Sequence, residues 1–208
     1  MEKRAKNNRQ YRTVLGIAPG TKNKRIESDY YIEGYAAKFE PYVLFEYPDG
    51  TKVYEKFNRE AFQNTDMSDI ILQFDHEGPV YARKSNGSLI VEVDDTGIFI
   101  AADLSRTQRG KELYDDISTG MITKMSWGFR PGEYRFNKDT QTIEHLSVKK
   151  IFDVSAVSIP ANEDTELHAR GFSEGVIQEL TQELRARNKR ILDLKIKSIL
   201  GEKGETHE

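Results

Sequence analysis

The chain has 208 residues, of which 37% are hydrophobic and 31% are charged, and its formal net charge at pH 7 is -3. This length suffices for one well-packed core with polar extensions. A slightly negative chain lacks the basic signature of a nucleic-acid-binding protein, so we expect no nucleic-acid partner. The absence of cysteine excludes disulfides, thiol catalysis and thiolate metal sites, and it is typical of intracellular proteins.

No apolar run approaches the roughly 20 residues that a membrane-spanning helix needs. The N-terminus also lacks the apolar core of a signal peptide. We therefore expect a protein that stays in the cell where it is made and has no membrane partner.

Residues 1–27 are strongly basic, with eight Lys and Arg residues against Glu2 and Glu27. Few apolar residues interrupt this stretch, a composition typical of a disordered arm. The alternatives are an arm that contacts an acidic partner and a leader that is removed during maturation.

From Tyr30 onward, alternating apolar residues separated by turn residues predict a series of short strands. The Pro-Asp-Gly sequence at 48–50 favours a hairpin between two of them. A short buried strand at 70–74 delivers Asp75, His76 and Glu77 at its end. The expected strands are 30–39, 43–47, 52–56, 70–74, 80–83, 88–93, 97–102, 120–129, 134–136, 142–148 and 151–159.

Two helices are expected among these strands. Asn58 is placed to cap a short helix over 59–62. Ser105 or Thr107 can cap a second helix that runs to about Ser118, and Gly120 then suits the left-handed position after its end. The sequence thus predicts an α+β, mainly β fold, with an antiparallel, partly closed β-barrel core and a few surrounding helices.

From Ser173 the pattern changes to apolar residues at three- and four-residue spacing, which predicts an amphipathic helix. This helix can pack on the core or on a partner helix. The predicted organisation is therefore a basic arm at 1–27, a core domain at 28–170 and an amphipathic helical tail at 171–208.

Three side chains could form a catalytic group of the serine-hydrolase type. Ser126 lies on an expected strand beside Gly128, which would allow close approach to the backbone. His76 stands at a strand end, where scaffolds often present catalytic groups. Nucleophilic catalysis also needs a group that orients the base, and Asp153, a carboxylate within an apolar strand, can supply it.

Alternatives to this group remain open on the residues alone. His145 is a rival for the third member, since a second imidazole can also orient the first. Asp75, His76 and Glu77 could instead serve a metal-dependent hydrolase, although no second histidine follows at ligand spacing. Ser126 could also be merely packed, in a β-barrel protein without activity.

Several motifs, in their order along the chain, resemble the prohead serine proteases of tailed bacteriophages, which are distant relatives of the herpesvirus assemblin proteases. The resemblance covers roughly residues 30–170. It rests on Ile32–Phe39, Leu72–His76, Gly78–Val80, Asp95–Ile98, Gly110–Ile117, Gly120, Met125–Phe129 and Asp153–Asn162.

The resemblance implies that His76 is the base, Ser126 the nucleophile and Asp153 the third member, with His145 as the alternative that the herpesvirus branch suggests. By looser analogy, backbone N–H groups near Arg130 and Gly132 would bind the oxyanion. No cofactor and no metal ion are implied.

The activity implied is endoproteolysis within an assembling procapsid in the host cytoplasm. The partners would be the major capsid protein, a scaffold protein or both, as substrates, and the enzyme would also cleave itself. The herpesvirus relatives dimerise, so a homodimer is a further implication. In this setting the basic arm and the tail helix would hold the enzyme to scaffold or capsid protein, or would be trimmed away.

Overall fold

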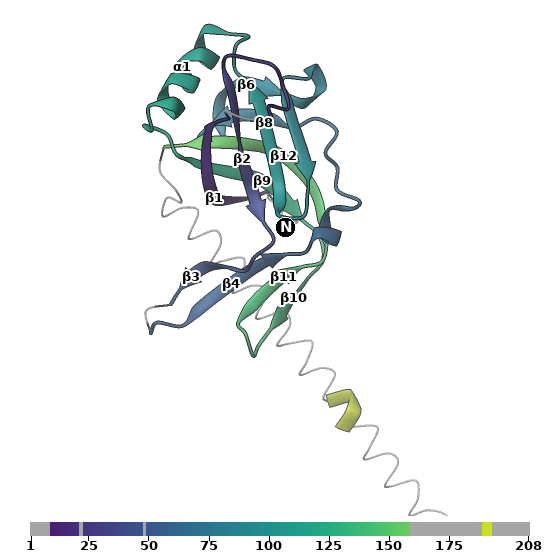
Figure 1. Ribbon diagram of the computed structural model, residues 1–208. Helices are drawn as coiled ribbons and strands as arrows, with labels where there is room; N and C mark the ends of the chain where they lie inside the picture. The colour runs from purple at the N-terminus through teal and green to yellow at the C-terminus, as the bar shows by residue number, and fades with distance from the viewer. Residues whose placement is uncertain (1–8, 21–22, 48, 159–188, 193–208) are drawn as a thin grey trace, which may run out of the picture. The chain divides into compact units, whose positions relative to one another are not determined.

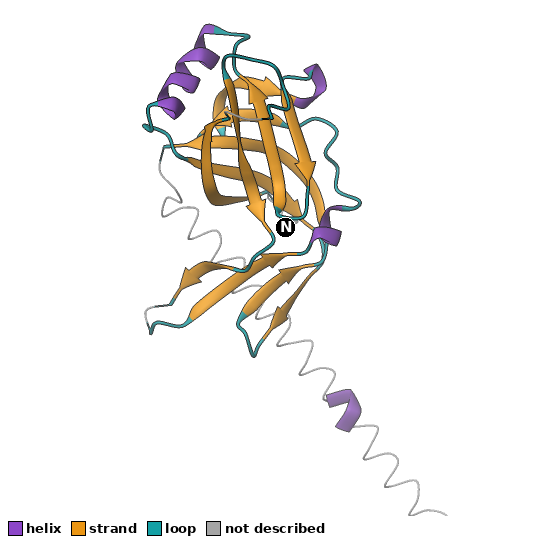
Figure 2. Ribbon diagram, in the orientation of Figure 1, coloured by secondary structure: helices purple, strands orange, loops and turns teal. Residues whose placement is uncertain are grey.

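The computed structural model describes residues 9–20, 23–47, 49–158 and 189–192. Strands dominate the described chain, as Figure 2 shows. The elements in chain order are β1 (Gln10–Pro19), β2 (Tyr31–Lys38), β3 (Tyr42–Glu46), β4 (Lys52–Phe57), η1 (Arg59–Phe62), β5 (Ile71–Phe74), β6 (Glu77–Arg83), η2 (Lys84–Asn86), β7 (Leu89–Val93), β8 (Gly97–Asp103), α1 (Gln108–Ser118), β9 (Lys124–Pro131), β10 (Tyr134–Asn137), β11 (Thr142–His145) and β12 (Val148–Val157).

The strands form two sheets. The larger has eight strands in the order β6-β5-β12-β9-β1-β2-β8-β7, and the smaller has four in the order β10-β11-β4-β3. The first and last strands of the larger sheet, β6 and β7, are consecutive in the chain and are joined through η2. The larger sheet therefore curls into a nearly closed barrel, with α1 at one end and the smaller sheet at the other (Figure 1).

The prediction of a mainly β, partly closed barrel with few helices is confirmed. Two details differ, because β12 pairs with β5, and β11 with β4, in parallel. The sheets are thus mixed. Of the three strands expected between residues 80 and 102, β7 and β8 pair with each other, whereas β6 pairs with β5 at the opposite end of the strand order.

Strand β1 is the main departure from the sequence-based expectation. We expected residues 10–19 to belong to a disordered arm, and for these residues the expectation is wrong. They form a strand that pairs with β9 on one side and β2 on the other. The basic composition concealed an alternating strand pattern, and pairing with two central strands satisfies the backbone groups of this segment.

Helix α1 and the turn after it follow the expectation. Thr107 accepts a hydrogen bond from the backbone N–H of Gly110, so it caps the helix. Gly120 has a φ of +78°, in the left-handed region.

The expected cap of the short helix η1 is not found. Asn58 precedes η1 but makes no capping hydrogen bond with its side chain. Instead, its amide donates to Glu144 Oε1 at 2.7 Å.

The expected tail helix lies outside the described residues except for residues 189–192, which are helical. The chain divides into two compact units, residues 1–169 and 170–208. Among the described residues, no helix is both long and apolar enough to cross a membrane.

A buried ionic cluster links the two sheets. Glu55 of β4, wholly buried, accepts hydrogen bonds from Arg12 of β1 at 2.5 Å and 2.8 Å. It also bonds to the hydroxyl of Tyr42 on β3 and, at 2.8 Å, to Nε2 of His145 on β11. Burial alone would raise the pKa of Glu55, but Arg12 and His145 outweigh that effect and hold the pKa well below its usual range.

We expect Arg12→Ala to lower the free energy of unfolding by about 3–5 kcal/mol, because it leaves the Glu55 carboxylate buried without its guanidinium partner. Urea denaturation followed by circular dichroism measures this loss. Arg59→Ala, which breaks an exposed pair with Asp95, is the matched control, and its effect should stay below about 1 kcal/mol. Equal effects of the two variants would contradict the importance assigned to the buried cluster.

Candidate functional site

Three adjacent strands of the barrel bring the predicted site residues together. Ser126 lies on β9, where it is paired with Ser155 of β12 on one side and Thr13 of β1 on the other. Asp153 lies on β12, two residues before Ser155. Alternation along β9 turns the apolar side chains of Met125 and Trp127 to the core, so Ser126 stands on the opposite face of the sheet.

His76 reaches this face from the turn between β5 and β6. The loop has two residues, Asp75 and His76, and both have φ in the left-handed region, at 47° and 61°. Such turns suit the twist of a hairpin but favour Asn and Gly. The left-handed region costs most residues about 1–2 kcal/mol, although Asp and His occur there more often than other side chains. Backbone strain of this kind is common at functional sites.

The strained turn is fixed by its own hydrogen bonds. The Asp75 carboxylate accepts hydrogen bonds from the backbone N–H and the hydroxyl of Ser158, at 2.9 Å and 2.7 Å. The Asp75 N–H donates to the carbonyl of Ala156 at 2.9 Å. Asp75 therefore anchors the turn to the end of β12. The neighbouring His76 is thereby placed beside Asp153 of β12 and Ser126 of β9.

The imidazole of His76 bridges the other two predicted residues. Its Nε2 lies 2.7 Å from Ser126 Oγ, and its Nδ1 is hydrogen-bonded to Asp153 Oδ2. With the ring proton on Nδ1, His76 donates to Asp153 and accepts from the Ser126 hydroxyl. In this arrangement an imidazole can take the hydroxyl proton while a carboxylate holds the ring in orientation.

Asp153 is wholly buried, and its two oxygens have different partners. Oδ2 accepts from His76 and, at 2.9 Å, from the hydroxyl of Ser155. Oδ1 forms an ion pair with the guanidinium of Arg9, just before β1. Because an isolated buried carboxylate is strongly disfavoured, these donors compensate for the burial of Asp153 in the sheet.

Gly128 makes room for this carboxylate. A Cβ atom added at Gly128 would lie 2.3 Å from Asp153 Oδ1 and 2.9 Å from Arg9 Nε. We had expected Gly128 to open the backbone beside Ser126. Its clear structural role is to leave space for the ion pair between Asp153 and Arg9.

The environment of His76 lowers the pKa of its imidazole below the ordinary value. Burial and, secondarily, the charge of Arg9 lower the pKa of its imidazole to about 4, while Asp75 acts in the opposite direction. An unprotonated imidazole at neutral pH can act as a general base.

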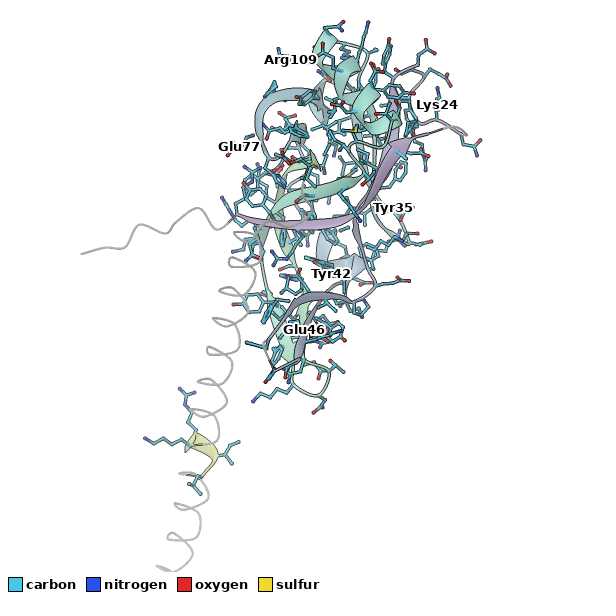
Figure 3. The ribbon with its side chains drawn as sticks, turned by 90° about the vertical axis from the view of Figure 1, so that its left-hand side faces the viewer. Lys24, Tyr35, Tyr42, Glu46, Glu77 and Arg109 are labelled. Atoms are coloured by element: carbon cyan, nitrogen blue, oxygen red, sulfur yellow. The ribbon has the colours of Figure 1, made fainter. Side chains whose placement is uncertain are left out.

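His145, the rival third member, lies elsewhere. It is wholly buried, is bonded to Glu55 and stacks on Phe57 with ring centroids 4.3 Å apart. In Figure 3 the labelled Tyr42, another partner of Glu55, lies on the smaller sheet, and the labelled Glu77, next to His76, lies at the start of β6 in the larger sheet. His145 therefore belongs to the buried ionic cluster, whereas Asp153 contacts His76.

The expected metal alternative gains no support from the geometry. Asp75 is engaged with Ser158 and His76 with Ser126 and Asp153, so their side chains do not converge. In the part of the chain that the structure describes, no group of three or more His, Cys, Asp and Glu side chains could hold a metal ion.

The backbone N–H of Gly132, one of the donors suggested for the oxyanion, already makes a hydrogen bond within the sheet region. The N–H of Gly132 donates to the carbonyl of Ser147 at 2.9 Å. This correction follows from pairing at the end of β9, which sequence spacing does not reveal.

Sequence reasoning missed two residues that contact Asp153. Ser155 could have been found, because alternation along the predicted strand puts it on the same face as Asp153. Arg9 carried no such signal. It was one of many basic residues in a presumed arm, and its contact depends on the pairing of β1 with β9.

The lowered pKa of His76 can be measured by NMR titration of its imidazole Cε1–H signal, assigned with a His76→Asn variant. We expect a midpoint near pH 4 in the folded protein and near the ordinary value of about 6.5 in urea. The unfolded state then binds more protons between these two values, so stability should fall as the pH drops through that window. A folded-state midpoint at or above 6.5 would contradict the proposed environment.

Comparison with known proteins identifies the family of the chain. The family model described as Caudovirus prohead serine protease matches residues 20–178. Searches of curated proteins and of solved structures gave no match. The match spans more than half of the chain, and the chain therefore belongs to the caudovirus prohead serine protease family.

Proposed function

We propose that this protein is the endopeptidase of phage head maturation and that Ser126, His76 and Asp153 are its catalytic residues. As a member of this family, the protein is a serine peptidase that acts in phage capsid assembly. The observation that supports the residue assignment is the His76 imidazole, hydrogen-bonded to Ser126 through one nitrogen and to Asp153 through the other.

The proposed reaction is acyl transfer through a covalent intermediate. As Ser126 Oγ attacks the scissile carbonyl carbon, its proton passes to His76 Nε2 and a tetrahedral oxyanion forms. The C–N bond then breaks, His76 donates the proton to the leaving amine, and Ser126 holds the acyl group. Water, deprotonated by His76, attacks this ester, and a second collapse releases the acid product and restores the Ser126 hydroxyl.

Asp153 would serve this cycle in two ways. Its hydrogen bond to Nδ1 keeps the ring proton away from the nitrogen that must accept the Ser126 proton. Its negative charge stabilises the imidazolium that forms during attack. Backbone N–H donors for the oxyanion would contribute about 3–4 kcal/mol each.

The proposed substrates are the N-terminal scaffolding segment of the major capsid protein or a separate scaffold protein, together with the enzyme itself. Cleavage would take place in the host cytoplasm, within the procapsid, and would clear the shell for DNA. A homodimer is part of this proposal because the distant herpesvirus relatives dimerise.

Co-expression with the cognate major capsid protein tests the proposed function. We expect the wild-type protein to shorten the capsid protein on a gel, with or without a chelator, and Ser126→Ala to leave it at full length because the nucleophile is missing. Cleavage by the Ser126→Ala variant would overturn the proposal. Chelator-sensitive cleavage would favour a metal hydrolase, and packaged but inactive wild-type protein would favour a structural role.

A second comparison tests the choice of third member. Asp153→Asn should lower the cleavage rate on the order of 10,000-fold, because the amide favours the wrong imidazole tautomer. His145→Gln should retain a rate comparable with wild type once rates are normalised to folded protein by circular dichroism. The reverse ranking would assign the role to His145.

A further inference from the structure

The N-terminal end of β1 forms one wall of the candidate site. Tyr11 lies against His76, with ring centroids 4.2 Å apart. The Arg9 guanidinium lies 5.2 Å from the Tyr11 ring centroid and 4.7 Å from that of Phe152 on β12. Tyr11 therefore packs against the His76 imidazole, and Arg9, two residues earlier, places its guanidinium on the Asp153 carboxylate.

Because Arg9 contacts Asp153, the two oxygens of this carboxylate have different partners. Arg9 binds Oδ1, which leaves Oδ2 directed at His76 Nδ1. A carboxylate on a single Cβ–Cγ bond can rotate, so a donor on one oxygen fixes the direction of the other. The aromatic contacts of Arg9 in turn restrict the guanidinium.

We propose that Arg9 is a positioning residue for the reaction assigned above, and that the candidate site is complete only when the start of β1 is docked on β9. This inference rests on the proposed function. It goes beyond the family match, which begins at residue 20 and does not include Arg9 or β1.

Arg9 has two opposing electrostatic effects. Its charge stabilises ionised Asp153, which the mechanism needs, but it also disfavours the imidazolium of His76. The charged groups that face His76 are Asp153 from β12, Arg9 from the segment before β1, and Asp75 from the turn itself. Loss of Arg9 should therefore misdirect Asp153 and at the same time make His76 easier to protonate.

The test uses the full-length protein and diisopropyl fluorophosphate, which reacts with activated serine hydroxyls and needs no known peptide substrate. The second-order rate of reaction is measured against pH for wild type, Arg9→Ala, Arg9→Gln and Arg9→Lys. Lys150→Ala is the matched control, because Lys150 also lies over the Phe152 ring, at 5.7 Å, but pairs with Asp66 instead of Asp153.

For Arg9→Ala and Arg9→Gln we expect the plateau rate to fall on the order of 100-fold, as when a catalytic group is displaced by about 1 Å. The acid limb of the profile should move to higher pH, which a purely structural defect would not produce. Arg9→Lys, which keeps the charge, should hold the limb near its wild-type position and recover part of the rate. Lys150→Ala should match wild type.

Wild-type rates and profiles in both neutral variants would overturn the role of Arg9 while leaving the proposed function intact. A reduced plateau with an unmoved acid limb in Arg9→Gln, with circular dichroism equal to wild type, would also overturn it. An inert wild-type protein would overturn the proposed function, and with it this inference.

Discussion

A buried carboxylate in the middle of β12 is the constraint that organises the site. Asp153 is wholly removed from water, and an unpaired charge in that position would be incompatible with a stable sheet. Three neighbours contact the Asp153 carboxylate: His76 from a turn, Ser155 from the same strand, and Arg9 from the segment before β1. The same requirement explains why β9 has a glycine at position 128, where any Cβ would collide with the carboxylate.

The geometry of the site depends on a strained turn and on two rigid strands. Two residues of the β5–β6 turn adopt left-handed backbone angles, and the anchoring of Asp75 to Ser158 holds them there. The central strands β9 and β12 are paired on both sides, so Ser126 and Asp153 have little freedom to move. A second ionic cluster, around Glu55, ties β1 to the smaller sheet and so supports the strand that brings Arg9 to the site.

Most of the barrel could be predicted from the sequence, because alternation and turn residues mark strands such as β2 and β12 locally. The larger sheet's strand order could not, since the parallel pairing of β12 with β5 joins segments about 80 residues apart. Ser126, His76 and Asp153 could be named as candidates from residue type and resemblance, but their contact follows from the pairing of β12 with both β5 and β9. The separation of His145 from them follows from the pairing of β11 with β4 in the smaller sheet. Strand β1 was missed because its basic composition resembled a disordered arm, while partners on both sides decide its structure.

The most direct test of the central claim is to locate the serine that His76 activates. After reaction with diisopropyl fluorophosphate at neutral pH, peptide mass spectrometry should find the phosphoryl adduct on Ser126. The adduct should be absent when His76 is replaced by alanine in an otherwise folded protein. An adduct on another serine, or undiminished labelling of Ser126 without His76, would contradict the account.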